Sequence, residues 1–196
     1  MKMQKKTIIT LVIVAVALIL VFSFIGIYIG TYNGMAQGRE KVDAARSNID
    51  TVLQRRADLI PNLVSTVKAL SSHELEALDK VTAARAAMVG ASNTADKLAA
   101  NEELTTAINA LVVSVEAYPE ISSAKAYTSL MDELSGTENR IAVARRDYNN
   151  AVKTYNNKLI TFPNNIIAGM FGFEKEVYYE ASAGAETTPS VEDLFG

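Results

Sequence analysis

The 196-residue chain contains no cysteine, no tryptophan and a single histidine, His73. The lack of cysteine excludes disulfide scaffolds, thiolate-ligated zinc or iron–sulfur sites and cysteine nucleophiles. A zinc site needs several ligands within reach, so His73 is interpreted as a helix-capping or solvent-exposed residue, and no metal or cofactor is expected. The chain also lacks a glycine-rich phosphate loop and a serine nucleophile motif. No catalytic residue is therefore assigned, and the chain is predicted not to be an enzyme.

An excess of basic charge is also missing. The chain has 19 basic and 22 acidic side chains, and the first 30 residues hold three of the lysines and no acid. The remainder therefore has 16 basic and 22 acidic groups, a formal charge of −6. Because affinity for nucleic acid depends on a basic surface, nucleic acid is not expected as a partner.

The chain does contain one long apolar run, from Thr7 to Tyr28, with 22 residues and no charge. At about 1.5 Å per residue this run gives roughly 33 Å of helix, enough to cross a hydrocarbon core of about 30 Å. Residues 1–6 form a basic flank, and residues 7–30 are assigned as a single transmembrane anchor. The alternative, a cleaved signal peptide, is disfavoured by the length of the run and the absence of a small-residue cleavage pattern.

The charges that flank the anchor predict its orientation. Lys2, Lys5 and Lys6 precede it, and the first cation beyond it is Arg39. The positive-inside rule then places the N-terminus in the cytoplasm, and the rest of a single-pass inner-membrane protein outside it. The lipid bilayer is thus the first expected partner.

Four glycines recur every four residues at the end of the anchor: Gly26, Gly30, Gly34 and Gly38. This spacing puts them close to one face of a helix, where a second helix could approach and form a homo-oligomer. The alternative is that the glycines loosen the passage from the membrane to the following domain, because glycine weakens a helix by about 1 kcal/mol relative to alanine.

The remaining sequence has the three-and-four spacing of apolar residues that is typical of amphipathic helices. It predicts helices over residues 32–70, 73–88, 95–118 and 127–162. Together they form an all-α antiparallel four-helix bundle over residues 31–175, followed by a flexible tail, 176–196. Pro61 predicts a kink in the first helix, and the spacing from Ser71 to Glu74 predicts a capping box. The apolar segment 164–173 is too short to span a bilayer and is expected to dock on the bundle or lie on the membrane surface.

Two polar clusters interrupt the apolar stripes and provide the candidate site. Arg56 occupies a core position, so its guanidinium should pair with a carboxylate, for which Asp58, Glu138 and Asp147 are candidates. One interpretation is an internal salt-bridge network that fixes the helix register; the other is a polar groove for a peptide or a partner helix. The candidate residues are Arg55, Arg56, Asp58, Pro61 and Asn62 in the first cluster, and Glu138, Asn139, Arg140, Arg145, Arg146, Tyr148 and Asn149 in the second.

Several motifs resemble the LemA family of bacterial membrane proteins. The likeness begins with the run Arg55 to Val64 and is strongest from Gly136 to Asn149, and it also covers Glu116 to Pro119 and Ala168 to Phe173. The resemblance implies a single-span anchor, a four-helix bundle, a non-enzymatic role and a partner in the cell envelope. Arg46 departs from the pattern, because the family usually has tryptophan there.

Three functions remain as hypotheses. The first is a membrane-anchored interaction or scaffold module that binds an envelope protein through the first and fourth bundle helices. The second is a sensor that binds an anion between its helices through Arg55, Arg56, Arg140 and Arg145. The third, a hydrolase with a carboxylate pair, has no specified acid, base or nucleophile.

Overall fold

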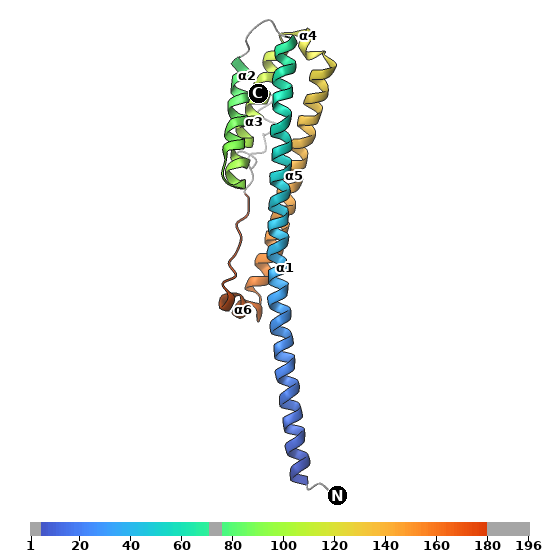
Figure 1. Cartoon of the computed structure of the whole chain (residues 1–196), viewed down its shortest axis with the longest axis vertical. Helices are drawn as coiled ribbons and strands as arrows, with labels where there is room; N and C mark the ends of the chain where they lie inside the picture. Colours follow the sequence, from blue (N-terminus) through green and yellow to red (C-terminus); the bar gives the residue numbers. More distant parts are fainter. Residues whose placement is uncertain (1–4, 71–75, 180–196) are drawn as a thin grey trace, which may run out of the picture. The chain divides into compact units, whose positions relative to one another are not determined.

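The computed structural model describes residues 5–70 and 76–179, and these residues form helices and connections without any strand (Figure 1). The predicted all-α class is therefore confirmed. The helices are α1 (Lys5–Leu70), α2 (Glu76–Gly90), α3 (Thr94–Val115), α4 (Pro119–Ser122), α5 (Lys125–Ile160) and α6 (Asn164–Phe171).

The chain divides into two compact units, to which α1 and α5 both contribute. The anchor unit consists of residues 1–43 and 150–177, and the bundle unit consists of residues 44–149 and 178–196. Each unit has its own contacts and is described separately.

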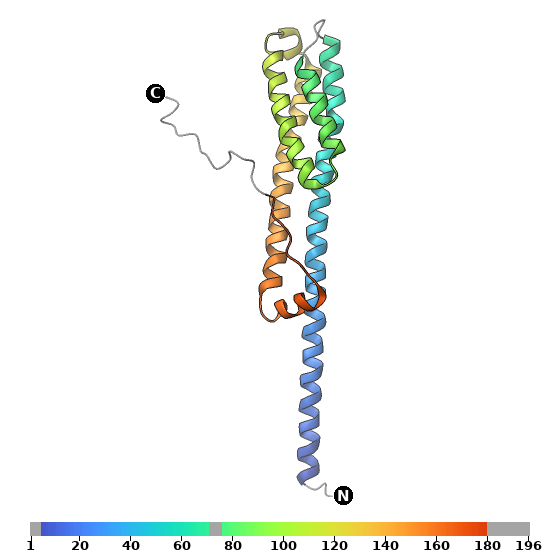
Figure 2. The ribbon, with the colours of Figure 1, turned by 90° about the vertical axis from the view of Figure 1, so that its left-hand side faces the viewer.

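The bundle unit is an antiparallel four-helix bundle built from the second part of α1, α2, α3 and the first part of α5 (Figure 2). Its helices pack through the apolar stripes that the sequence predicts. The most deeply buried core side chains include Ile49, Leu53, Ile60, Leu63, Leu104, Leu111, Leu134 and Ile141. Short connections between successive helices favour this up-and-down arrangement.

Local signals explain where the bundle helices begin and end. The side chain of Asn93 accepts a hydrogen bond from the backbone N–H of Asp96 at 2.9 Å and caps α3. Pro119 occupies the start of the short helix α4, a position where its missing N–H costs nothing. The sequence did not predict α4 as a separate helix. The predicted capping box, from Ser71 to Glu74, lies outside the described residues.

Proline does not end the first bundle helix. α1 runs without interruption from Lys5 through Pro61 to Leu70, so the anchor and the first bundle helix are one helix of 66 residues. Pro61 itself is exposed. The kink expected near it stays a prediction.

The anchor unit contains the apolar part of α1, the end of α5, α6 and the extended segment that follows. From Ile8 onward, α1 is long and apolar enough to cross a membrane. The rest of the chain buries none of its most apolar stretch. A helix with apolar side chains on all sides and no protein cover is suited to lipid. The N-terminal part of α1 is thus the candidate transmembrane helix that the sequence predicts.

Candidate functional site

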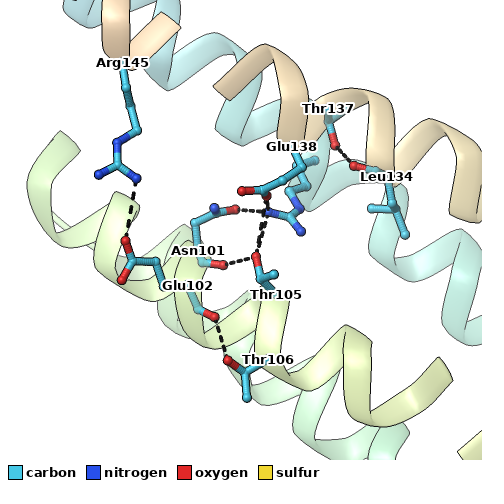
Figure 3. Close-up of polar contacts among 9 residues, drawn as sticks. Asn101, Glu102, Thr105, Thr106, Leu134, Thr137, Glu138 and Arg145 are labelled. Carbon is cyan, nitrogen blue, oxygen red and sulfur yellow. Dashed lines mark hydrogen bonds and ion pairs between the residues drawn. The ribbon is translucent and has the colours of Figure 1, made fainter. Parts of the chain in front are cut away.

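The centre of the candidate site is Arg56, which is only 3% exposed inside the bundle unit. Its Nη1 donates hydrogen bonds to Asn101 Oδ1 at 2.6 Å and to Thr105 Oγ1 at 3.1 Å, and it forms an ion pair with the Glu138 carboxylate. Figure 3 shows Asn101, Thr105 and Glu138 converging on one guanidinium. Of the three predicted carboxylate partners, the structure selects Glu138.

The network ties three helices together. Arg56 lies on α1, Asn101 and Thr105 lie on α3, and Glu138 lies on α5. The Thr105 hydroxyl also donates to the backbone carbonyl of Asn101 at 2.9 Å. The Thr105–Asn101 bond lies within α3, whereas the three contacts of Arg56 cross between helices, so the network agrees with the interpretation of an internal salt bridge that fixes the helix register.

Burial lowers the pKa of the Arg56 guanidinium, and the Glu138 carboxylate opposes this effect by its charge and its hydrogen bond. An arginine keeps its proton in proteins even so. The Arg56 Nε atom has no hydrogen-bond partner among the residues that the structure describes. Glu138 is 43% exposed at its side chain, so the pair lies at the edge of the core and water reaches its acidic half.

Sequence reasoning missed Asn101 and Thr105, although the sequence contains a signal for the first of them. Asn101 falls between Leu98 and Leu104 at the three-residue spacing of the buried stripe of α3. A polar side chain at such a position needs a partner inside the bundle. The apolar spacing of the sequence thus places one polar side chain on each of two helices, Arg56 on α1 and Asn101 on α3, and each needs a partner inside the bundle.

The outer part of the predicted cluster faces solvent. On α1 and α5 of the bundle unit the exposed candidates are Arg55, Asp58, Pro61, Asn62, Asn139, Arg140 and Arg146. Asp58 accepts a hydrogen bond from Gln54 Nε2 at 2.8 Å, along the surface of its own helix. Arg145 is half-buried and lies 3.6 Å from Glu102 on α3. The predicted cluster therefore splits into an internal network and an exposed set.

Tyr148 and Asn149 hold the chain that follows α6. The Tyr148 ring is 2% exposed, and its centroid lies 4.3 Å from that of Tyr179. Asn149 Nδ2 donates to the backbone carbonyl of Tyr179 at 2.8 Å, and its Oδ1 accepts from the Tyr179 N–H at 3.0 Å. The start of the predicted flexible tail is thus fixed to α5 as far as Tyr179.

Arg46, at the position where tryptophan was expected, contacts an aromatic ring itself. Its guanidinium carbon lies 5.7 Å from the Tyr148 ring centroid, and its Nη2 donates to the Tyr148 hydroxyl at 3.3 Å. A guanidinium can pack on an aromatic face and contribute about 0.5–1 kcal/mol where it is partly exposed. The departure from the family pattern is therefore accommodated.

The four regularly spaced glycines of α1 have two different environments. A Cβ atom on Gly38 would lie 3.1 Å from Tyr155 Cδ2, and one on Gly34 would lie 3.8 Å from Lys158 Nζ. Nothing lies within 4 Å of a Cβ placed on Gly26 or Gly30. The close approach at Gly38 thus serves packing within the chain, and association of two copies through the face with Gly26, Gly30, Gly34 and Gly38 stays a prediction.

The sequence comparisons agree with this architecture. The model of the LemA family matches residues 45–192. The chain belongs to the LemA family. It is 27% identical over 209 aligned positions to magnetosome protein MamQ 2 of Paramagnetospirillum magneticum, covering 93% of this chain and 77% of that protein. It is 24% identical over 163 positions to protein LemA of Metamycoplasma hominis, covering 81% and 73% respectively.

The magnetosome protein MamQ of Magnetospirillum gryphiswaldense is a further relative, 26% identical over 206 positions that cover 90% of this chain and 76% of that protein. The family description and the names of these relatives identify no reaction. Among the described residues, no group of three or more His, Cys, Asp or Glu side chains could hold a metal ion. His73 lies outside those residues. The protein is thus a membrane-associated helical member of the LemA family.

Proposed function

We propose that this chain is a membrane-anchored interaction module, and that it binds another protein of the cell envelope through the exposed polar faces of α1 and α5 in the bundle unit. The observation that supports the proposal is that some residues of the polar cluster are buried and paired, while others are exposed. Arg56 and Glu138 satisfy each other inside the bundle, whereas Arg55, Asn62 and Arg140 are exposed. The internal network is structural, and the exposed set is available to a partner.

The same geometry disfavours the anion sensor. A sensor would need several arginines directed at one site that carries no negative charge of its own. Arg56 is already paired with Glu138, and Arg145 lies beside Glu102. Arg55 and Arg140 are exposed. The buried positive charge is therefore neutralised by the protein's own carboxylates. A saturable rise in melting temperature with added phosphate or sulfate would revive the sensor.

The relatives fit an interaction role as well. Two of them are named as magnetosome proteins, and these names specify no reaction. A module that holds other proteins at a membrane is the simplest function for a chain that combines a membrane anchor with a helical bundle in which no catalytic residue is assigned. The family name alone does not identify the partner.

Site-specific photo-crosslinking in intact cells tests the proposal. A photoreactive residue is placed at Asn62 on α1 or at Arg140 on α5, and the matched controls carry it at Ala86 on α2 or Ala99 on α3, which are also exposed. We expect a discrete crosslinked product from the α1 and α5 positions and none from the controls. Equal products from all four positions, or none from any, would overturn the proposal.

We also propose that the N-terminus is cytoplasmic, that the anchor spans the inner membrane and that the bundle lies outside the cytoplasm. The lysines that precede the anchor support this orientation. Because the chain has no cysteine, a Ser92→Cys variant carries a single reporter thiol on an exposed bend. A membrane-impermeant maleimide should label it in intact cells. Labelling only after lysis would place the bundle in the cytoplasm.

A further inference from the structure

The end of the anchor unit has an apolar surface that the chain itself leaves uncovered. It consists of four large side chains at the end of α5, before α6 and on α6. Phe162 is 81% exposed, Met170 68%, Ile160 55% and Ile166 54%. Ile166 and Met170 are four residues apart and share one face of α6, while Ile167 and Ala168 on the same helix are buried. Exposed large apolar side chains that gather in one part of a chain are typical of a surface that contacts a membrane or another protein.

The contacts of α6 place it at one level of α1. The Phe171 ring meets the rings of Tyr28 and Tyr32 edge-on, with centroids 5.6 and 4.9 Å apart. At the other end of α6, the Thr31 hydroxyl donates to Asn164 Oδ1 at 3.4 Å. Both ends of α6 therefore lie beside the same short stretch of α1.

This arrangement fixes the direction of α6. Its 8 residues have a length of about 12 Å, whereas residues 28–32 of α1 rise by only about 6 Å along the helix axis. α6 must therefore run across α1 and not along it, as Figure 2 shows. If α1 crosses the membrane, α6 lies close to the membrane plane.

The level of α6 coincides with the end of the apolar run of α1. A hydrocarbon core of about 30 Å takes about 20 residues of helix, so a core that begins near Ile8 ends near Tyr28. Tyrosine rings favour this boundary. The chain from Leu159 to Phe173 carries no charge. Lys158, just before it, donates from Nζ to the carbonyl of Gly34 at 3.1 Å, on the water side of Tyr32.

From these observations we infer that α6 is an interfacial membrane helix, which inserts Phe162, Ile166 and Met170 into the bilayer that α1 spans. The bilayer is the occupant because the patch adjoins the transmembrane helix at the headgroup level. Interfacial helices bury their apolar face about 5–10 Å into the boundary between headgroups and acyl chains. The inference deepens the proposed membrane anchoring, since α6 would add a second contact with the bilayer.

Tryptophan fluorescence of the full chain in phosphatidylcholine vesicles tests the inference, because the chain has no tryptophan of its own. Ile166→Trp and Met170→Trp each report the α6 face. We expect emission at shorter wavelength than in free solution, strong quenching by lipid brominated near the headgroup end of its acyl chains, and weak quenching by aqueous acrylamide. Val113→Trp, on the exposed surface of α3, is the matched control and should show the reverse.

Two outcomes would overturn the inference. If both α6 variants behave as Val113→Trp does, the α6 face is in water. If their emission is shifted and shielded from acrylamide but unaffected by brominated lipid, protein covers the face, for example a second copy of the chain. A Leu18→Trp variant tests the transmembrane anchor separately from the α6 contact. If α1 spans the membrane, lipid that is brominated deep in the bilayer should quench the fluorescence of this tryptophan. If no such quenching occurs, both the transmembrane anchor and the interfacial position of α6 are refuted.

Discussion

At the scale of single residues, one buried arginine determines how the polar residues of the bundle are arranged. Arg56 can lie in a core position because its guanidinium forms hydrogen bonds and an ion pair with Asn101, Thr105 and Glu138 on two other helices. A buried charge without such partners would cost several kcal/mol. The carboxylate partner could be narrowed to three residues from the sequence, but the choice of Glu138 required the helix register, which apolar spacing alone does not define.

A double-mutant cycle on this pair should show strong coupling. Glu138→Gln leaves the Arg56 charge buried without its counterion, so we expect a loss of about 1–3 kcal/mol in unfolding free energy. Arg56→Met should cost a similar amount because it leaves the buried Asn101 unsatisfied. The double variant should lose less than the sum, with a coupling of about 1 kcal/mol or more. Denaturant unfolding in detergent micelles measures all three; simple additivity would argue against the network.

Tyr155 makes a different residue-scale prediction. Its hydroxyl is buried with no hydrogen-bond partner among the described residues, and burial raises the pKa of the phenol, an effect that the charge of Arg39 partly opposes. Ionisation therefore favours the unfolded chain, in which the pKa is about 10. The folded state therefore keeps its unfolding free energy at pH values below about 10 and loses part of it as the pH rises through the higher pKa of Tyr155 in the folded state.

We therefore expect Tyr155→Phe to leave the unfolding free energy at neutral pH unchanged or to raise it by up to about 1 kcal/mol. The variant should also lose less stability than the parent between neutral pH and pH values above about 10. Thermal unfolding across this range is the measurement, and Tyr178→Phe, at a half-exposed ring, is the control. An equal alkaline loss in parent and Tyr155→Phe would contradict this account.

At the scale of elements, the helices were predictable from the sequence because apolar residues recur at three-and-four spacing over long runs. The least predictable features were those set by contacts between elements. The continuity of α1 through Pro61 is one, since a helix can tolerate an exposed proline. The attachment of residues 176–179 to α5 is another. It consists of hydrogen bonds from asparagine side chains to the backbone of the segment, so no side-chain pattern within the segment predicts it.

Glycine substitutions along α1 should separate packing from flexibility. Alanine at Gly38 would press on the Tyr155 ring, which is fully buried and cannot move aside easily. Overpacking of this kind costs about 1–3 kcal/mol, against a gain of about 1 kcal/mol in helix propensity. Gly38→Ala should thus lower the melting temperature, whereas Gly34→Ala, which meets only the flexible end of Lys158, should not. The opposite order would refute the packing role.

The segment that follows α6 should be released by a change of one side chain. Asn156 Nδ2 donates to the carbonyl of Glu176 at 2.8 Å, and its Oδ1 accepts from the Glu176 N–H at 2.9 Å. Asn156→Asp keeps the shape but replaces the donor by an acceptor, so it repels that carbonyl.

Tryptic cleavage after Lys175 measures the release. It should be faster in Asn156→Asp than in the parent, while the exposed neighbour variant Asn157→Asp should be cleaved at the parental rate. Equal rates in all three proteins would show that the asparagine does not hold the segment.

At the scale of the whole molecule, the chain combines a transmembrane helix with a bundle whose buried polar groups are satisfied mainly within the bundle. The anchor could be predicted from the long uncharged run between Thr7 and Tyr28, and the bundle from the three-and-four spacing of apolar residues in the acidic remainder. The identity of a partner could not be predicted in this way, since an exposed polar face carries no chemical signature comparable to a metal site. The proposed binding of a partner therefore depends on the difference between the buried and the exposed residues of the polar cluster.

That difference can be measured by recording the melting temperature and the photo-crosslinking yield from Asn62 in two variants, Arg140→Glu and Glu138→Gln. Arg140 is exposed, so its reversal should change stability by no more than about 0.5 kcal/mol but abolish the crosslinked product. Glu138→Gln should lower the melting temperature and leave the product intact below it. A product that survives Arg140→Glu, or that disappears in folded Glu138→Gln, would contradict the assignment of partner binding to the exposed face.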